Sequence, residues 1–264
     1  MKRQRKERIS KDRRRFRKGI YILPNLITSL NMFFGFFAII LSMEGNFTMA
    51  ATLIIIAGFC DGLDGKIARA TRTTSKFGVE YDSLADLVSF GVAPALMFYL
   101  WILMPLGRLG WLACFLFTAC GALRLARFNT QSGTGGNDFF SGLPIPAAAG
   151  MLATTIIIFQ RLGLTHSVPP VFFLVPLYGL SFLMVSTLRY HSFKKPELFR
   201  RMNFNVLVGV ILVFIFVAAE HEIALFLAAC IYVTSGPLLA LRHRKSSGAG
   251  DKSVGEEEED PRAV

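Results

Sequence analysis

The sequence predicts an all-α integral membrane protein with about eight transmembrane helices. Of its 264 residues, 53% are hydrophobic and only 18% are charged, whereas about a quarter of the residues in a soluble domain are charged. The apolar residues also gather in long runs, and a run of about 20 has the length of a membrane-spanning helix. We expect spans at about 22–43, 47–70, 83–104, 109–129, 143–162, 169–188, 203–219 and 222–241.

The chain begins with a basic arm, residues 1–20, in which Lys and Arg recur from Lys2 to Lys18. A secretory signal starts in a similar way, but its apolar core has only about 7–15 residues and ends at a small-residue cleavage site. We therefore expect an uncleaved first span behind a juxtamembrane arm, which either only orients the chain or also contacts anionic lipid. The net charge of +11 thus predicts a lipid bilayer, and no nucleic acid, as partner.

The basic residues also predict the orientation. With eight spans, both termini and every second turn lie on one side, and all Lys and Arg except Arg108 and Arg161 fall on that side. By the positive-inside rule this side is the cytoplasm. We expect a multi-pass protein of the cell (inner, cytoplasmic) membrane. Residues 196–242 are expected to form two accessory spans, and residues 243–264, with a run of acidic side chains, a disordered cytoplasmic tail.

Four aspartates lie within or beside the apolar runs, where ionisable groups are costly and indicate function. Asp61 and Asp64 are three residues apart near the end of the second span, and Asp82 and Asp86 are four apart at the start of the third. Each pair therefore shares one helix face. Two antiparallel helices joined by a short turn would bring the four carboxylates together at the cytoplasmic rim of the membrane.

Four neighbouring anions repel one another unless protons or cations compensate them. Carboxylate oxygens favour Mg²⁺, Mn²⁺ or Ca²⁺, and four carboxylates can hold two such ions. A cation or proton pathway is an alternative, although its acids are usually distributed through the bilayer. Gly65 and Gly78 are explained equally well by close helix packing. The position at the rim favours a reaction that joins a lipid to a water-soluble molecule.

The two helices carry a motif that resembles the complete signature of the CDP-alcohol phosphatidyltransferases: Asp61-Gly-Leu-Asp64-Gly65-Lys-Ile-Ala68-Arg69, eight residues, Gly78, three residues, Asp82, three residues, Asp86. The resemblance implies a six-helix transferase core over residues 21–195 and a homodimer. It also implies two divalent ions, Mg²⁺ or Mn²⁺, held mainly by Asp61, Asp64 and Asp82. Asp86 would complete the metal ligands and act as general base. The CDP-lipid would contact Asn25, Thr28, Asp64, Gly65, Ala68, Arg69 and Gly78.

Further segments are similar to the membrane-embedded phosphatidylserine synthases of this family: Leu23-Pro24-Asn25 with Thr28 and Asn31, Arg124-Leu-Ala-Arg127-Phe-Asn129, residues 140–150, and residues 186–194. This similarity implies that CDP-diacylglycerol and L-serine are the substrates and that phosphatidylserine and CMP are the products. Arginine forks match a carboxylate or a phosphate, so Arg124, Arg127 and Arg189 are candidates for the serine carboxylate. Asn129 or a backbone carbonyl near Gly142 could receive the ammonium group.

Other interpretations stay open at this point. The arginines are also typical of positive-inside anchors. A sibling transferase would use glycerol 3-phosphate, inositol phosphate or choline as the acceptor. From other functional classes, the acidic cluster also fits a divalent-cation transporter or a catalytically silent lipid-binding protein.

Overall fold

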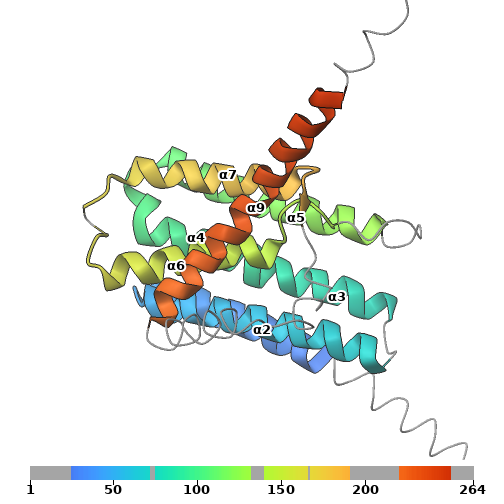
Figure 1. Cartoon of the computed structure of the whole chain (residues 1–264). Helices are drawn as coiled ribbons and strands as arrows, with labels where there is room; N and C mark the ends of the chain where they lie inside the picture. Colours follow the sequence, from blue (N-terminus) through green and yellow to red (C-terminus); the bar gives the residue numbers. More distant parts are fainter. Residues whose placement is uncertain (1–24, 72–74, 132–139, 166, 191–219, 251–264) are drawn as a thin grey trace, which may run out of the picture.

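A computed structural model describes residues 25–71, 75–131, 140–165, 167–190 and 220–250, and confirms the all-α prediction for them. The first helix is Asn25–Met43. After it come α2 (Phe47–Thr71), α3 (Lys76–Asp86), η1 (Leu87–Val92), α4 (Ala93–Phe98), η2 (Tyr99–Leu103), η3 (Met104–Leu106), α5 (Arg108–Gln131), β1 (Phe140–Ser141), α6 (Ile145–Arg161), η4 (Pro170–Phe173), α7 (Leu174–Val185), β2 (Arg189–Tyr190) and α9 (His221–Gly250). Figure 1 labels the α-helices α2 to α7 and α9.

Several of these helices are suited to a membrane. Five are long and apolar enough to cross one: Asn25–Met43, Phe47–Ile67, Lys76–Leu106, Arg108–Thr130 and His221–Leu239. The expected fifth and sixth spans correspond to shorter apolar helices, Ile145–Arg161 and Pro170–Val185. The expected seventh span, 203–219, and the basic arm, 1–20, lie outside the described residues. The chain is therefore an all-α membrane protein, and its count of eight spans stays a prediction.

The third helical segment differs from the expectation, because it begins at Lys76 and not near residue 83. The Ser75 hydroxyl caps it by accepting a hydrogen bond from the Gly78 amide at 2.9 Å. Its first turns, which include Glu80, are polar, so apolar runs alone place the start too late. Further along, the segment contains two π-helical stretches, η1 and η2.

The core of the bundle is built around α6. Its buried face includes Ala148, Ala149 and Ala153, whose small side chains let neighbouring helices approach closely. α2 and α9 pack against α6, while α5 packs against α7. An aromatic cluster closes the end near Arg161, where the ring centroids of Phe159 and Phe173 are 5.1 Å apart.

The last helix does not stand apart from this core. α9 crosses α6 diagonally (Figure 1), and its start is fixed by Arg161, which forms ion pairs with Glu220 at 2.6 Å and Glu222 at 3.3 Å. α9 continues to Gly250, so residues 243–250, expected to begin a disordered tail, are helical. Residues 251–264 lie outside the described part of the chain. The short strands β1 and β2 pair antiparallel at the opposite end of α6.

Candidate active site

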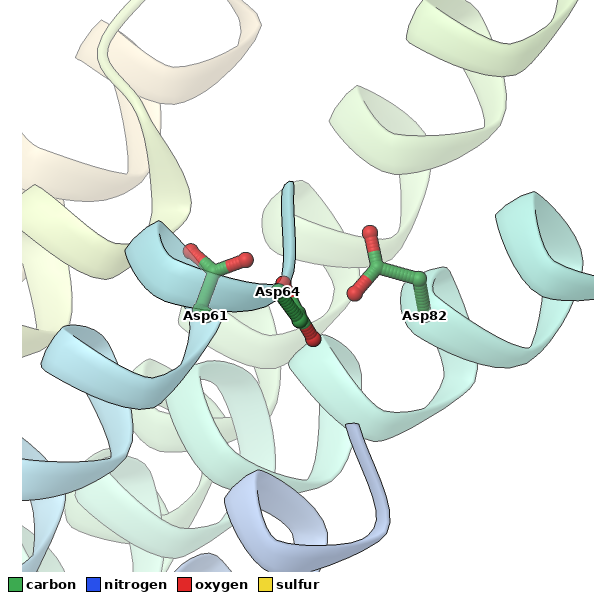
Figure 2. Close-up of side chains that lie close together, drawn as sticks. All are labelled: Asp61, Asp64 and Asp82. Atoms are coloured by element: carbon green, nitrogen blue, oxygen red, sulfur yellow. The ribbon is translucent and has the colours of Figure 1, made fainter. Parts of the chain in front are cut away.

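Three of the four predicted aspartates converge between α2 and α3. One ligand oxygen from each of Asp61, Asp64 and Asp82 lies within 4.8 Å of the others, and Figure 2 shows the three side chains turned toward one another. Asp61 and Asp64 share a face because they are three residues apart on α2. Asp82 meets them because α2 and α3 are consecutive helices joined by a short connection. Asp64 and Asp82 are separated from this connection by similar numbers of residues.

The chain compensates this negative charge only in part. Asp64 is 3% exposed, and its Oδ2 accepts a hydrogen bond from the Thr28 hydroxyl at 2.8 Å. The buried Oδ1 of Asp82 has no hydrogen-bond partner among the described residues. Buried carboxylates are normally paired, hydrogen-bonded or bound to metal. An oxygen-rich group with an unpartnered buried oxygen therefore fits a hard divalent cation.

Asp86 lies beside this group, on the same helix as Asp82. Asp86 is the last residue of α3, is 7% exposed and is not part of the group whose oxygens lie within 4.8 Å. Its Oδ1 accepts a hydrogen bond from the Asn31 side-chain amide at 3.0 Å. The predicted quartet thus divides into a cluster of three carboxylates and a fourth, one helical turn beyond Asp82.

The residues expected around the CDP-lipid lie next to this cluster where the structure describes them. A side chain at Gly78 would come within 3.5 Å of the Asn25 amide oxygen, so this glycine allows the first helix to approach α3. Gly65 is half-buried on α2. Ala68 and Arg69 belong to α2, but their side chains lie outside the described part.

Two residues of the expected acceptor site come together at the ends of α5 and α7. The Arg127 guanidinium donates hydrogen bonds to the carbonyls of Val185 at 3.0 Å and Ser186 at 3.2 Å. Gly142 has a φ of +86°, and a Cβ there would lie 3.2 Å from the Arg127 guanidinium. Glycine thus permits both the left-handed turn and the close approach of the arginine.

The other three acceptor candidates have different surroundings. Asn129 donates to Ser83 at 3.0 Å and to Glu80 at 3.2 Å, which connects α5 to α3. Arg124 is 8% exposed, and its Nε has no hydrogen-bond partner among the described residues. Arg189 pairs through β2 with Ser141, but its side chain lies outside the described part.

Comparison with known proteins identifies the family. The model of the CDP-alcohol phosphatidyltransferase family matches residues 21–187. The chain belongs to this family. The match contains all four aspartates, and the protein is therefore a multi-pass membrane phosphatidyltransferase of phospholipid biosynthesis.

Several curated members of the family are similar to this phosphatidyltransferase. The CDP-diacylglycerol–serine O-phosphatidyltransferase of Helicobacter pylori is 40% identical over 196 residues, which cover 74% of this chain and 83% of the relative. The enzyme of the same name from Bacillus subtilis is 36% identical over 173 residues, 66% of this chain and 92% of the relative. The archaetidylserine synthase of Methanothermobacter thermautotrophicus is 38% identical over 170 residues, 64% of this chain and 69% of the relative.

Sequence reasoning gave no site role to Asn31, which the structure places against Asp86 of this phosphatidyltransferase. It also assigned Thr28 to the CDP-lipid alone, whereas the Thr28 hydroxyl contacts Asp64. The sequence signal for these roles was that Thr28 and Asn31 are polar side chains, three residues apart, inside an apolar run. That spacing places both side chains on one helix face but does not say which helix the face meets.

Proposed function

We propose that this protein transfers the phosphatidyl group of CDP-diacylglycerol to the hydroxyl of L-serine, giving phosphatidylserine and CMP. The observation that carries the proposal is the convergence of Asp61, Asp64 and Asp82 beside a separate, buried Asp86. Relatives at 36–40% identity that bear the name of serine transferases support serine as the acceptor.

Asp61, Asp64 and Asp82, with Asp86 near them, would hold two divalent ions, Mg²⁺ or Mn²⁺. Such ions, when bound, neutralise the pyrophosphate of the donor and stabilise the CMP that leaves. The unpartnered buried oxygen of Asp82 supports this assignment. The donor would lie along Asn25, Thr28, Gly65 and Gly78, with Ala68 and Arg69 on the same helix as Gly65.

Asp86 would act as the general base. It takes the proton from the serine hydroxyl while the serine oxygen bonds to the lipid-linked phosphorus. The bond from that phosphorus to the CMP oxygen breaks, and its electron pair leaves with CMP. A carboxylate within hydrogen-bond reach of the hydroxyl can perform this step, and Asp86 lies beside the three clustered carboxylates without being one of them.

The acceptor would be bound by Arg124, Arg127, Asn129, Gly142 and Arg189. Of these, Arg124 has a buried Nε that no described residue satisfies, which suits a carboxylate or phosphate ligand. The asymmetric distribution of basic residues supports a site and both termini on the cytoplasmic side of the inner membrane. We further propose that the protein acts as a homodimer, as the family resemblance implies.

The test is to incubate the purified protein with CDP-diacylglycerol, Mn²⁺ or Mg²⁺ and a panel of alcohols, and to measure CMP release. We expect serine to give the fastest release, and Asp86→Asn to lower the rate by at least about 100-fold, the smaller effect expected of a lost general base. CDP-diacylglycerol binding to this variant should be largely retained, because the clustered aspartates are intact.

Three outcomes would contradict parts of the proposal. Faster CMP release with glycerol 3-phosphate, inositol phosphate or choline would replace serine by that acceptor. Full turnover by Asp86→Asn would remove Asp86 from the role of base. Metal flux into sealed vesicles without CMP release would favour a divalent-cation transporter.

A further inference from the structure

The first helix, Asn25–Met43, contacts both of the most buried aspartates through side chains one turn apart. The Thr28 hydroxyl donates to Asp64 at 2.8 Å, and the Asn31 amide donates to Asp86 at 3.0 Å. Each hydrogen bond joins residues distant in sequence, and both are buried. The helix therefore supplies one donor to the carboxylate cluster and a second, separate donor to Asp86.

Asn31 makes this contact at a buried position where its own side-chain oxygen is unsatisfied by the described residues. It is completely buried, and its Oδ1 has no hydrogen-bond partner among the described residues. An unsatisfied buried polar group costs about 1–3 kcal/mol. Turning the amide over would not help, because Oδ1 would then face the carboxylate of Asp86. Packing alone therefore does not explain an asparagine here.

The backbone of Asn31 is held as tightly as its side chain. The Ser89 hydroxyl donates to the Asn31 carbonyl at 2.9 Å. One turn further on, Gly35 packs against Ser89 so closely that a Cβ would lie 2.8 Å from the Ser89 Cβ. Ser89 belongs to η1, the π-helical stretch that directly follows Asp86, and such stretches are frequent at functional sites. Asp86 and Asn31 are thus both held where the first helix packs against η1.

We propose that Asn31 is a positioning residue for Asp86. By donating to Oδ1 it fixes the plane of the carboxylate and leaves Oδ2 to receive the proton of the acceptor hydroxyl. This inference rests on the proposed role of Asp86 as general base. Misplacing a reacting group by about 1 Å can cost about 100-fold in rate, so a single hydrogen bond that sets this orientation has a large effect.

The test compares Asn31→Leu, which keeps the branched shape of the side chain but is larger and has no donor, with the wild type in detergent. We expect kcat for CMP release to fall about 100-fold, while the KM and equilibrium binding of CDP-diacylglycerol stay within about two-fold because Asp61, Asp64 and Asp82 are untouched. Asn31→Ala, which adds no bulk, should show the same fall in kcat with the same KM and donor binding. It replaces the leucine variant if that variant does not fold.

Two further variants of the same helix serve as comparisons. Ser42→Ala removes a buried hydroxyl that bonds only within the helix, to the Ala38 carbonyl, and should keep wild-type kcat and KM. Thr28→Val removes the donor to Asp64 and should instead raise the Mn²⁺ concentration needed for half-maximal rate. A positioning role therefore predicts a lower kcat for Asn31→Leu and a higher Mn²⁺ requirement for Thr28→Val.

A kcat within about three-fold of the wild type in folded Asn31→Leu would overturn the inference. So would a parallel loss of kcat, donor binding and thermal stability in both Asn31 variants, because it would indicate a purely structural role. Asp86→Asn separates this failure from that of the proposed function. An inactive Asp86→Asn beside a normal Asn31→Leu rejects only the inference, whereas an active Asp86→Asn rejects the base itself.

Discussion

Single side chains divide the four aspartates into unequal roles. Asp64 and Asp86 each accept a hydrogen bond from the first helix, whereas the buried Oδ1 of Asp82 accepts none from the described residues. Close to Asp61 and Asp64, the charge of Asp82 is therefore repelled more than it is compensated. We therefore expect a bound cation to favour the charged form of Asp82.

This imbalance predicts that Asp82→Asn changes how stability depends on metal. Without divalent ions, in EDTA, the variant should unfold at the same temperature as the wild type or higher, because one repelling charge is gone. Added Mn²⁺ should stabilise the variant less than it stabilises the wild type. Half-maximal CMP release should require at least about ten-fold more Mn²⁺, the lower end of the affinity loss expected when a metal site is disturbed. Thermal unfolding with and without Mn²⁺ checks this.

Glu80→Gln is the matched control, because Glu80 lies on the same helix but bonds to Asn129 outside the cluster. It should respond to Mn²⁺ as the wild type does. Equal stabilisation of Asp82→Asn and the wild type by Mn²⁺ would contradict the assignment of Asp82 to the metal.

The residue spacing predicted that the aspartates of the two helices meet, since i, i+3 and i, i+4 pairs on consecutive helices leave few alternatives, and three of the four lie in one cluster. It could not predict the donors to Asp64 and Asp86. Those contacts depend on how the first helix lies across α2 and α3, and nothing in the local sequence around Asn31 encodes that placement. Spacing and family motif both grouped Asp86 with the other three, and only the fold shows that its oxygens lie outside the cluster within 4.8 Å.

Among the elements, the packing of the first helix against η1 sets the distance between Asn31 and Asp86. A methyl group at Gly35 would meet the backbone of Ser89 as well as its side chain, so the first helix would have to move away. We expect Gly35→Ala to lower the free energy of unfolding by about 1–3 kcal/mol, the usual cost of overpacking. CMP release should fall as well, because the movement separates Asn31 from Asp86.

Gly150→Ala on α6 controls for the loss of a helical glycine, since no atom lies within 4 Å of a Cβ at that position. It should be as stable as the wild type or up to about 1 kcal/mol more stable. Thermal unfolding and the CMP assay on both variants test the prediction, and a Gly35→Ala protein with normal stability and rate would show that the packing against η1 tolerates displacement.

Element boundaries followed from the sequence only where apolar runs coincide with helices. α3 begins early because Ser75 caps polar turns. The π-helical η1 is not visible in hydropathy, although Pro94, just beyond it, lacks the amide that a regular helix would use. There the Ala93 amide donates to the Val88 carbonyl, five residues back.

At the scale of the whole molecule, different segments of the chain lie at the two ends of α6. Its start lies beside Gly142, whose amide donates to the carbonyl of Leu188, next to β2. At its other end, Arg161 pairs with Glu220 at the start of α9. Tyr190 and Glu220 therefore lie near opposite ends of α6. The expected seventh span at 203–219 lies outside the described residues and stays a prediction.

The same arrangement predicts which positions face the cytoplasm. Thr130, exposed at the end of α5, and Leu162, exposed after α6, lie near the two opposite ends of the bundle. In intact cells, a membrane-impermeant maleimide should label Leu162→Cys but reach Thr130→Cys only after the membrane is opened. The wild type controls for its own cysteines, which are buried or half-buried in the spans. Labelling of Thr130→Cys alone in intact cells would invert the topology, and with it the aspartates would face away from the cytoplasm that supplies serine.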